Sequence, residues 1–145
     1  FKAGDASVAD ADSPPIQLLG SGSIMQQVLT AQQLLADQGI AADVYSVTSY
    51  SLLYRDAVDC EAWNRDHPGD PDREPYLTEL LAGKSGRFIA VSDYMKVLPA
   101  SIARWVPGEL ICLGTDGYGL SESREALRDH FGISAEQIVR AALAG

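Results

Sequence analysis

The sequence predicts an α/β fold of three layers, in which helices cover both faces of a mostly parallel sheet. Strand and helix signals alternate along most of the chain, and each strand signal is a short apolar run near glycine or proline. Strands joined through helices need crossover connections, which make neighbouring strands parallel and place helices on the sheet faces. With 145 residues, 46% of them hydrophobic, the chain can bury one core without disulfides or metals.

Four strands are expected from their apolar runs. The first run, "IQLLG", lies directly between a proline and the glycine that ends it, which is typical of a buried strand. The others resemble it in length and in apolar character. The expected strands are Ile16–Gly20, Ala42–Val47, Arg87–Val91 and Glu109–Gly114.

Helices are expected between these strands. The first follows a glycine-rich turn, with Ser23 as its N-cap and Gln26 completing a capping box, and Gly39 stops it. The second helix begins at Ser51 and ends before the proline-rich loop at 66–75. Apolar side chains near one side of this second helix are expected to face the core: Leu52, Leu53, Ala57, Cys60 and Trp63.

Further helices are expected in the second half of the chain. A short one begins at Pro75, and another covers about residues 96–105, where Pro99 is tolerable because it lies in the first turn. Two helices close the chain. The last of them starts with a second capping box, formed by Ser134 and Gln137.

The N-terminal residues have a different character. The stretch "GDASVADADSPP" at 4–15 is small, acidic and ends in prolines, which indicates a linker. It leaves "FKA" isolated at the start of a chain that has no initiator methionine. We therefore assign residues 1–15 to an N-terminal stub and linker and residues 16–145 to the α/β domain, and we expect the chain to be a fragment of a longer protein.

Composition narrows the classes of function. The formal charge of −9 argues against a nucleic-acid surface, which usually needs a basic face. No apolar run approaches the ~20 residues that cross a bilayer, and no signal peptide is evident, so a cytoplasmic location is expected. Cys60 and Cys112 have no spacing typical of zinc sites or disulfides and are expected to be buried free thiols.

The turn "GSGS" at 20–23 is the first candidate binding site, because strand-to-helix turns often hold phosphates. The dinucleotide fingerprint needs a third glycine, and Met25 occupies that position. It also needs an acid at the end of the second strand, whereas Asp43 lies near the start. The turn is therefore interpreted as a structural bend in which glycines allow the turn and Ser23 caps the helix.

The second candidate is the glycine- and hydroxyl-rich loop "GTDGYGLSESR", which follows the fourth strand. Open α/β sheets hold ligands at the carboxyl ends of their strands, and the loop after the third strand leaves the same edge. The two loops are expected to bind a ligand or to support a neighbouring domain, and the sequence leaves both alternatives open. Their candidate residues are Asp93, Tyr94, Thr115, Asp116, Tyr118, Ser121 and Arg124.

Catalytic and metal-binding patterns are not found in the sequence. His67 lies in the proline-rich loop and His130 near a helix end, and neither is accompanied by a nucleophile motif. No pair of carboxylates stands out, and no histidine, cysteine or carboxylate spacing suggests a metal. We therefore expect no catalytic, cofactor-binding or metal-binding residue in this chain.

Several long segments together resemble one family, and the likeness extends over about residues 16–144. The chain is similar to the C-terminal domain of the homodimeric bacterial pyruvate dehydrogenase E1 component, a member of the transketolase superfamily. The segments that carry the resemblance are "IQLLGSGSIMQQV", "DVYSVTSY", "DCEAWNRDHP", "SDYMK" and "LGTDGYGLSESREALRDHF".

The resemblance implies a Rossmann-like domain with a mixed sheet of five strands whose first strand is antiparallel, and "FKA" is expected to be the remainder of that strand. It also implies a parent that decarboxylates pyruvate with thiamine diphosphate and Mg²⁺ and passes the acetyl group to the lipoyl group of the E2 acetyltransferase. The cofactors lie between the N-terminal and middle domains of two subunits. The C-terminal domain packs beside the middle domain and helps to shape the dimer.

The leading hypothesis is therefore a non-catalytic domain of a larger oxidoreductase, inactive when isolated. Its partners would be the other domains of its chain, the second subunit and, through the parent, E2. One alternative is a stand-alone regulatory module that binds an anion or a nucleotide, and another is a module that itself docks E2. Tyr94, Met95 and Tyr118 are interpreted either as a surface that contacts a neighbouring domain or as core residues.

Overall fold

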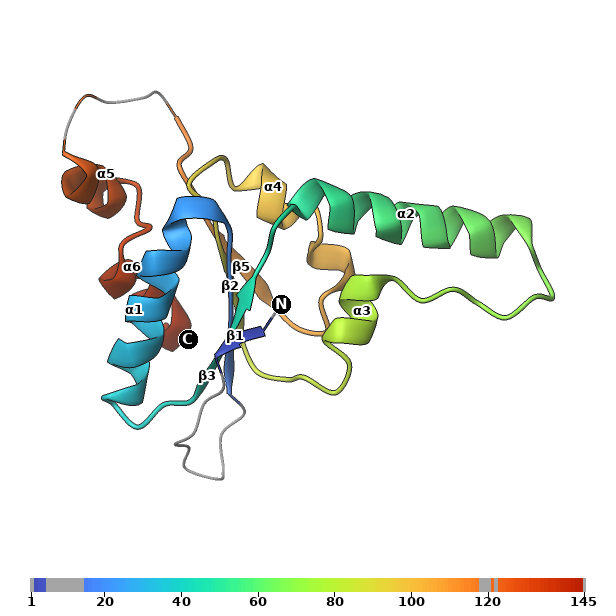
Figure 1. Cartoon of the computed structure of the whole chain (residues 1–145), viewed down its shortest axis with the longest axis horizontal. Coiled ribbons are helices and arrows are strands. Elements are labelled where there is room, and N and C mark those ends of the chain that lie inside the picture. The colour runs from blue at the N-terminus through green and yellow to red at the C-terminus, as the bar shows by residue number, and fades with distance from the viewer. Residues whose placement is uncertain (1, 5–14, 118–120, 122, 145) are drawn as a thin grey trace.

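A computed structural model describes residues 2–4, 15–117, 121 and 123–144 of the chain (Figure 1). Its centre is one sheet of five strands in the order β1-β3-β2-β4-β5. The edge strand β1 is antiparallel to β3, and every other pair of neighbours is parallel. The strands are β1 (Lys2–Gly4), β2 (Ile16–Gly20), β3 (Ala42–Ser46), β4 (Phe88–Val91) and β5 (Leu110–Leu113).

This sheet confirms the predicted fold class. The four predicted strands are present within one or two residues of their expected ends. The antiparallel edge strand implied by the resemblance is also present, and it lies in the stretch that we assigned to the N-terminal stub.

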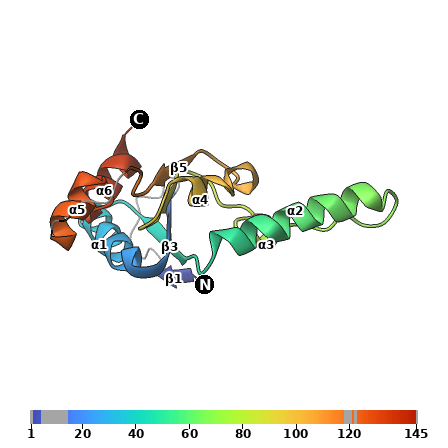
Figure 2. The same cartoon turned by 90° about the horizontal axis from the view of Figure 1, so that it is seen from above.

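Helices cover both faces of the sheet, as expected for three layers (Figures 1 and 2). One face carries α1 (Met25–Ala36), α5 (Arg124–His130) and α6 (Ala135–Leu143). The other carries α2 (Tyr50–Asp66), α3 (Tyr76–Leu80) and α4 (Val97–Ala100).

The core consists of two apolar clusters separated by the sheet. Adjacent residues of a strand point to opposite faces, so Leu18 belongs to the cluster under α1 and α6 while Leu19 belongs to the cluster under α2 and α3. Both side chains are almost fully buried. Because each central strand is buried on both faces, its sequence is a continuous apolar run, which explains why the strands were predictable.

Buried polar side chains are paired within the sheet. Tyr45 donates its hydroxyl to Gln17 Oε1 at 2.9 Å, and Gln17 Nε2 donates to the Pro15 carbonyl oxygen at 2.9 Å. Lys84 Nζ donates to Asp43 Oδ2 at 3.0 Å, and Asp43 is almost fully buried. Asp43, the acid that lies too early in β3 for the dinucleotide fingerprint, is therefore paired with a half-buried lysine.

Helix α2 and the segment 67–75 that returns from it form an arm that extends beyond the sheet (Figures 1 and 2). The Asn64 side chain ties the arm together, since Nδ2 donates to the Arg73 carbonyl oxygen at 2.9 Å and Oδ1 accepts from the Arg73 backbone N–H at 2.8 Å. The Trp63 ring stacks on His67 and lies under the Arg73 guanidinium. The outer end of the arm is thus held by local contacts, whereas Tyr50 and Ala57 at the inner end of α2 are buried.

The predicted details of α2 need correction. The helix begins at Tyr50, one residue before the predicted start at Ser51, and Ser49 caps it by accepting a hydrogen bond from the Leu52 backbone N–H at 3.2 Å. Ala57 is buried as expected, but Leu52 is exposed. Leu52 lies in the first turn of α2, on an exposed side of the helix. The outer part of α2 extends past the sheet, so Trp63 packs on His67 and Arg73 instead of the core.

Two other helix predictions were partly wrong. The helix predicted at 96–105 is divided into α4 and a 3-10 turn at Ala103–Trp105. It ends there because Val106 precedes a proline and is extended. Ser134 occupies the N-cap of α6 but forms no capping bond, and the Ala135 backbone N–H donates instead to Gln27 Oε1 at 3.0 Å.

Cys60 and Cys112 are both unpaired, as predicted, and half-buried. Partial burial raises the pKa of the Cys112 thiol, and the nearby Lys96 lowers it by less. Within the described part of the chain, no helix has the length and apolar character required to cross a bilayer.

Tyr50 differs from Tyr45 in one respect. Its hydroxyl is buried and has no hydrogen-bond partner among the described residues. Burial, with a smaller contribution from Cys112, raises the pKa of the Tyr50 phenol far above its usual value. The two tyrosines belong to the same apolar cluster, so they provide a matched pair.

We predict that Tyr45→Phe lowers the free energy of unfolding by about 2 kcal/mol, because Gln17 Oε1 loses its buried donor. Tyr50→Phe should leave the stability unchanged or raise it by about 1 kcal/mol, because it removes a buried hydroxyl that has no partner. Urea denaturation of the 145-residue chain at neutral pH measures both. Equal losses in the two variants would contradict the assignment.

Candidate functional site

The carboxyl ends of β2, β4 and β5 meet at one edge of the sheet. From β2 the chain crosses to β3 on one side, and it later returns to place β4 on the other side. The crossovers use α1 on one face of the sheet and α2 with α3 on the other. The gap between the ends of β2 and β4 is therefore a topological switch point, the position at which open α/β sheets bind ligands.

Ser23 and Asp93 connect the two sides of this switch point. Ser23 lies after β2 and Asp93 after β4, and Ser23 Oγ donates to Asp93 Oδ2 at 2.8 Å. The predicted capping box of Ser23 and Gln26 is thus wrong. A 3-10 turn at Gly22–Ile24 precedes α1, so the N-cap of α1 is Ile24, which has no polar side chain. Ser23 lies inside the turn and donates to a carboxylate 70 residues away in sequence.

The glycines of this turn act as predicted, by allowing the bend. Gly22 has a φ of 56°, in the left-handed region that favours glycine. A Cβ on Gly20 would lie 2.7 Å from Met25 Sδ and 2.8 Å from Val28 Cγ2, so the missing side chain lets α1 pack closely on the end of β2.

The loops after β4 and β5 are hydrogen-bonded to each other. The Thr115 backbone N–H donates to the Tyr94 carbonyl oxygen at 2.9 Å, and Thr115 Oγ1 donates to the Asp93 carbonyl oxygen at 3.1 Å. Asp116 Oδ1 accepts from the Lys96 backbone N–H at 3.0 Å, and Asp116 Oδ2 lies 3.6 Å from Lys96 Nζ. These bonds make the two loops one unit.

Gly114 allows the two loops to approach so closely. A Cβ at this position would lie 2.6 Å from the Tyr94 carbonyl oxygen and 2.9 Å from the Lys96 backbone nitrogen. Both atoms belong to the backbone, so they cannot move aside as the end of a flexible side chain does. Gly114 therefore sets the distance between the loop after β4 and the loop after β5.

A cleft of about 420 Å³ lies between these loops, the turn before α1 and helix α5. Arg124 and Arg128 come from α5 and are four residues apart, so they lie near one another on the helix surface. Leu127 and Phe131, both half-buried, supply apolar surface. The full lining is Ser23, Ile24, Asp93, Thr115, Gly117, Arg124, Leu127, Arg128, Phe131 and Ile133.

The structure brings together three of the predicted site residues, Asp93, Thr115 and Arg124, in this cleft. Asp116 does not line it, because its carboxylate is paired with Lys96. Ser121 is exposed and is not among the described residues that line the cleft.

Two cleft residues were missed by the sequence prediction. Ser23 was interpreted only as a cap, and Arg128 was not considered. The spacing of Arg128 from Arg124, one helical turn, is the signal that would have indicated it.

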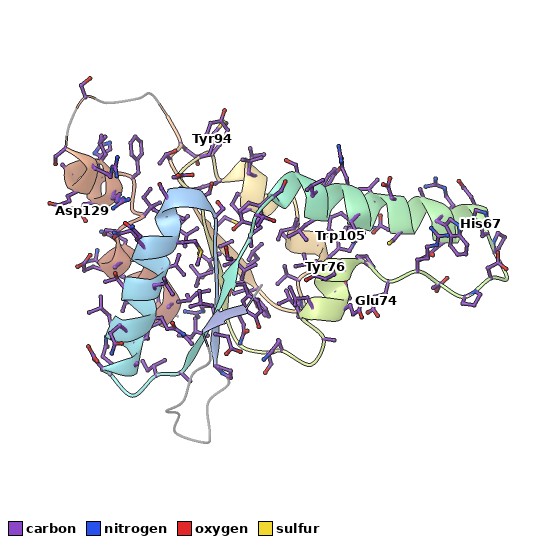
Figure 3. The ribbon with its side chains drawn as sticks, viewed as in Figure 1. His67, Glu74, Tyr76, Tyr94, Trp105 and Asp129 are labelled. Atoms are coloured by element: carbon purple, nitrogen blue, oxygen red, sulfur yellow. The ribbon has the colours of Figure 1, made fainter. Side chains whose placement is uncertain are left out.

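Tyr94 belongs to a separate surface (Figure 3). Its side chain is 60% exposed and points away from the sheet, and the neighbouring Met95 and Val97 are 47% and 61% exposed. We call these three residues the apolar patch. The sequence left open whether Tyr94 and Met95 are surface or core, and the structure places both on the surface; Tyr118 lies outside the described residues.

The histidines lie far apart. His67 is at the end of the arm, where its ring stacks on Trp63 at 4.3 Å and Nδ1 lies 2.8 Å from the Trp63 carbonyl oxygen (Figure 3). His130 is the last residue of α5, on the opposite face of the sheet. Each has a local structural contact, and neither lines the cleft.

The residues of the cleft do not fit the cofactor that the resemblance implies for the parent. A magnesium diphosphate needs several oxygen ligands. The cleft offers one carboxylate, Asp93, and one of its oxygens already accepts from Ser23. Among the described residues, no three histidine, cysteine or carboxylate side chains gather in a way that would hold a metal ion.

The chain is similar in sequence to one family of proteins over most of its length. Residues 4–134 match the family described as the transketolase-like TK C-terminal domain. The pyruvate dehydrogenase E1 component of Pseudomonas aeruginosa is 48% identical over 130 residues, which cover 88% of this chain and 15% of that protein. The Escherichia coli K12 E1 component is 46% identical over 130 residues, covering 88% of this chain and 14% of that protein. The chain thus spans about one seventh of the length of these relatives.

Solved structures agree on the fold. A transketolase from Campylobacter jejuni superimposes with a TM-score of 0.65 at 19% identity, covering 100% of this chain and 18% of that protein. A transketolase variant from Pichia stipitis gives a TM-score of 0.61 at 18% identity, covering 98% of this chain and 17% of that one. At such identities the likeness concerns the fold alone.

We predict that Gly114→Ala lowers the free energy of unfolding by about 2–3 kcal/mol, because the new Cβ forces two backbone segments apart. Gly39→Ala is the matched control: φ is 77° there, but nothing lies within 4 Å of the added Cβ, so only about 1 kcal/mol of backbone strain is expected. Denaturation measures both, and amide chemical shifts at Asp93 and Thr115 should change only in the Gly114 variant. A smaller loss in Gly114→Ala than in Gly39→Ala would contradict the prediction.

Proposed function

Because this chain belongs to the transketolase-like C-terminal domain family, we propose that it is the C-terminal domain of a pyruvate dehydrogenase E1 component. The proposed parent is a cytoplasmic, homodimeric oxidoreductase that decarboxylates pyruvate with thiamine diphosphate and Mg²⁺. It transfers the acetyl group to the lipoyl group of E2. In this proposal the domain supplies no catalytic group and supports the architecture of the parent.

The apolar patch is the observation that favours an architectural role. Three large apolar side chains are exposed within four consecutive positions, 94–97. Their backbone is fixed, since the Tyr94 N–H donates to Ser92 Oγ at 3.0 Å and the Leu98 N–H donates to the Met95 carbonyl oxygen at 3.1 Å. A rigid apolar surface suits a permanent contact, because little conformational entropy is lost when it is covered. The proposed cover is another domain of the parent.

The residues of the cleft also favour an architectural role for this domain over a catalytic one. Among the described residues that line the cleft, Ser23 and Asp93 are the one hydroxyl–carboxylate pair, and no histidine lines the cleft beside them. The proposed chemistry therefore belongs to the part of the parent that this chain does not span.

The proposal predicts that the purified 145-residue chain neither binds thiamine diphosphate nor consumes pyruvate when Mg²⁺ is supplied. Calorimetry with the cofactor and an assay of carbon dioxide release measure the two properties, with the full-length E1 component that carries this domain as the positive control. Turnover by the chain alone would refute the proposal.

Substitution of the apolar patch tests the architectural role. Tyr94→Ser combined with Met95→Ser should lower the melting temperature of the full-length enzyme by several degrees, because about 2–3 kcal/mol of apolar burial between domains is lost. The same double variant should leave the isolated chain almost unchanged, since both side chains are already exposed there.

Leu29→Ser is the control, because Leu29 is similarly exposed but lies on α1, away from the patch. It should change neither the full-length enzyme nor the isolated chain by a comparable amount. An unaltered melting temperature of the full-length double variant would refute a role of the patch between domains.

A further inference from the structure

The cleft at the carboxyl edge has a charge that differs from the rest of the molecule. The whole chain carries −9, whereas the charged side chains that line the cleft are Arg124, Arg128 and Asp93, two positive and one negative, which gives +1. Among the described residues, neither guanidinium forms a hydrogen bond or an ion pair. A local excess of positive charge in so acidic a protein favours an anionic ligand.

The guanidinium groups have the chemistry to bind such a ligand. Guanidinium donors pair bidentately with phosphate and carboxylate oxygens, and two of them on successive helical turns can bind one anionic group together. Arg128 is half-buried and also borders a neighbouring hollow that contains Glu125, Asp129 and Glu136. These carboxylates line that hollow and are not among the residues that line the cleft, which both arginines line.

The opposite wall of the cleft suits hydroxyl groups. Asp93 Oδ2 accepts from Ser23, which leaves Oδ1 as an acceptor, and Thr115 Oγ1 has lone pairs besides the bond that it donates. A second anionic group would be repelled by Asp93, whereas a ligand hydroxyl would donate to it. Leu127 and Phe131 add apolar surface to the cleft.

From these observations we infer that the cleft binds a small organic phosphate or carboxylate that carries hydroxyl groups. Arg124 and Arg128 hold the anionic group, and Asp93 accepts from a hydroxyl of the same ligand. The position between β2 and β4 is the one that the topology of the sheet reserves for ligands, and a volume of about 420 Å³ is within the range of small-molecule sites. The inference does not depend on the proposed function, because it concerns only residues of this chain.

Glycerol 3-phosphate is a suitable probe, since it combines a phosphate with two hydroxyl groups. We expect it to change the amide chemical shifts of Ser23, Asp93, Thr115 and the two arginines in the 145-residue chain, with millimolar affinity. Inorganic phosphate should bind about tenfold more weakly at the same residues, and glycerol should cause no change.

Two sets of variants distinguish the role of the α5 arginines from the role of Asp93. Arg124→Gln combined with Arg128→Gln should weaken glycerol 3-phosphate at least about tenfold. Arg55→Gln combined with Arg65→Gln removes the same charge from α2 and should leave the affinity unchanged. Asp93→Ala should remove most of the preference for glycerol 3-phosphate over inorganic phosphate, because it removes the acceptor for the ligand hydroxyl, whereas the loss of the carboxylate charge favours both anions alike.

Three results would overturn the inference. One is the absence of shifts in the cleft at about 20 mM glycerol 3-phosphate and low ionic strength. Another is an equal loss of affinity in the α2 control variant. The third is equal affinity of the unaltered chain for inorganic phosphate and glycerol 3-phosphate, which would exclude recognition of the hydroxyl groups.

Discussion

The close approach of two loops at Gly114 is the contact on which the carboxyl edge of this molecule depends. With no side chain at this position, the Tyr94 carbonyl oxygen can accept the Thr115 backbone N–H, and the loops after β4 and β5 become one hydrogen-bonded unit. That unit holds Asp93 on its inner side and the apolar patch on its outer side. One steric constraint therefore fixes two surfaces of opposite character.

These surfaces suit different kinds of contact. The outer surface is apolar, rigid and exposed, properties of a face that packs against a neighbouring domain. The inner surface is polar, concave and lined by two arginines, properties of a site for a small anion. Asp93 directly precedes Tyr94 in the chain, so the proposed ligand site and the proposed interface are adjacent.

Most of the fold could be predicted from the sequence, because the central strands are buried on both faces and appear as apolar runs. Side-chain capping was less predictable, since the sequence shows a hydroxyl but not its competing partners. Ser23 donates to Asp93 instead of capping α1, and Gln27 replaces Ser134 at the start of α6. In the site, Asp93, Thr115 and Arg124 were predictable because they follow strand ends. Arg128 was missed, although its spacing of one helical turn from Arg124 puts both side chains near one another on α5; that α5 lies beside the carboxyl edge of the sheet is known only from the structure.

The arm has a practical consequence for experiments that test the proposed architectural role. It extends away from the sheet, its return segment is tied by Asn64, and the space around Gly69 at its end is open. Exposed loop tips of this kind tolerate insertions and labels. A fluorophore attached beside Gly69 would be remote from both the cleft and the apolar patch. It would therefore report how the domain is oriented within a larger assembly without altering either surface.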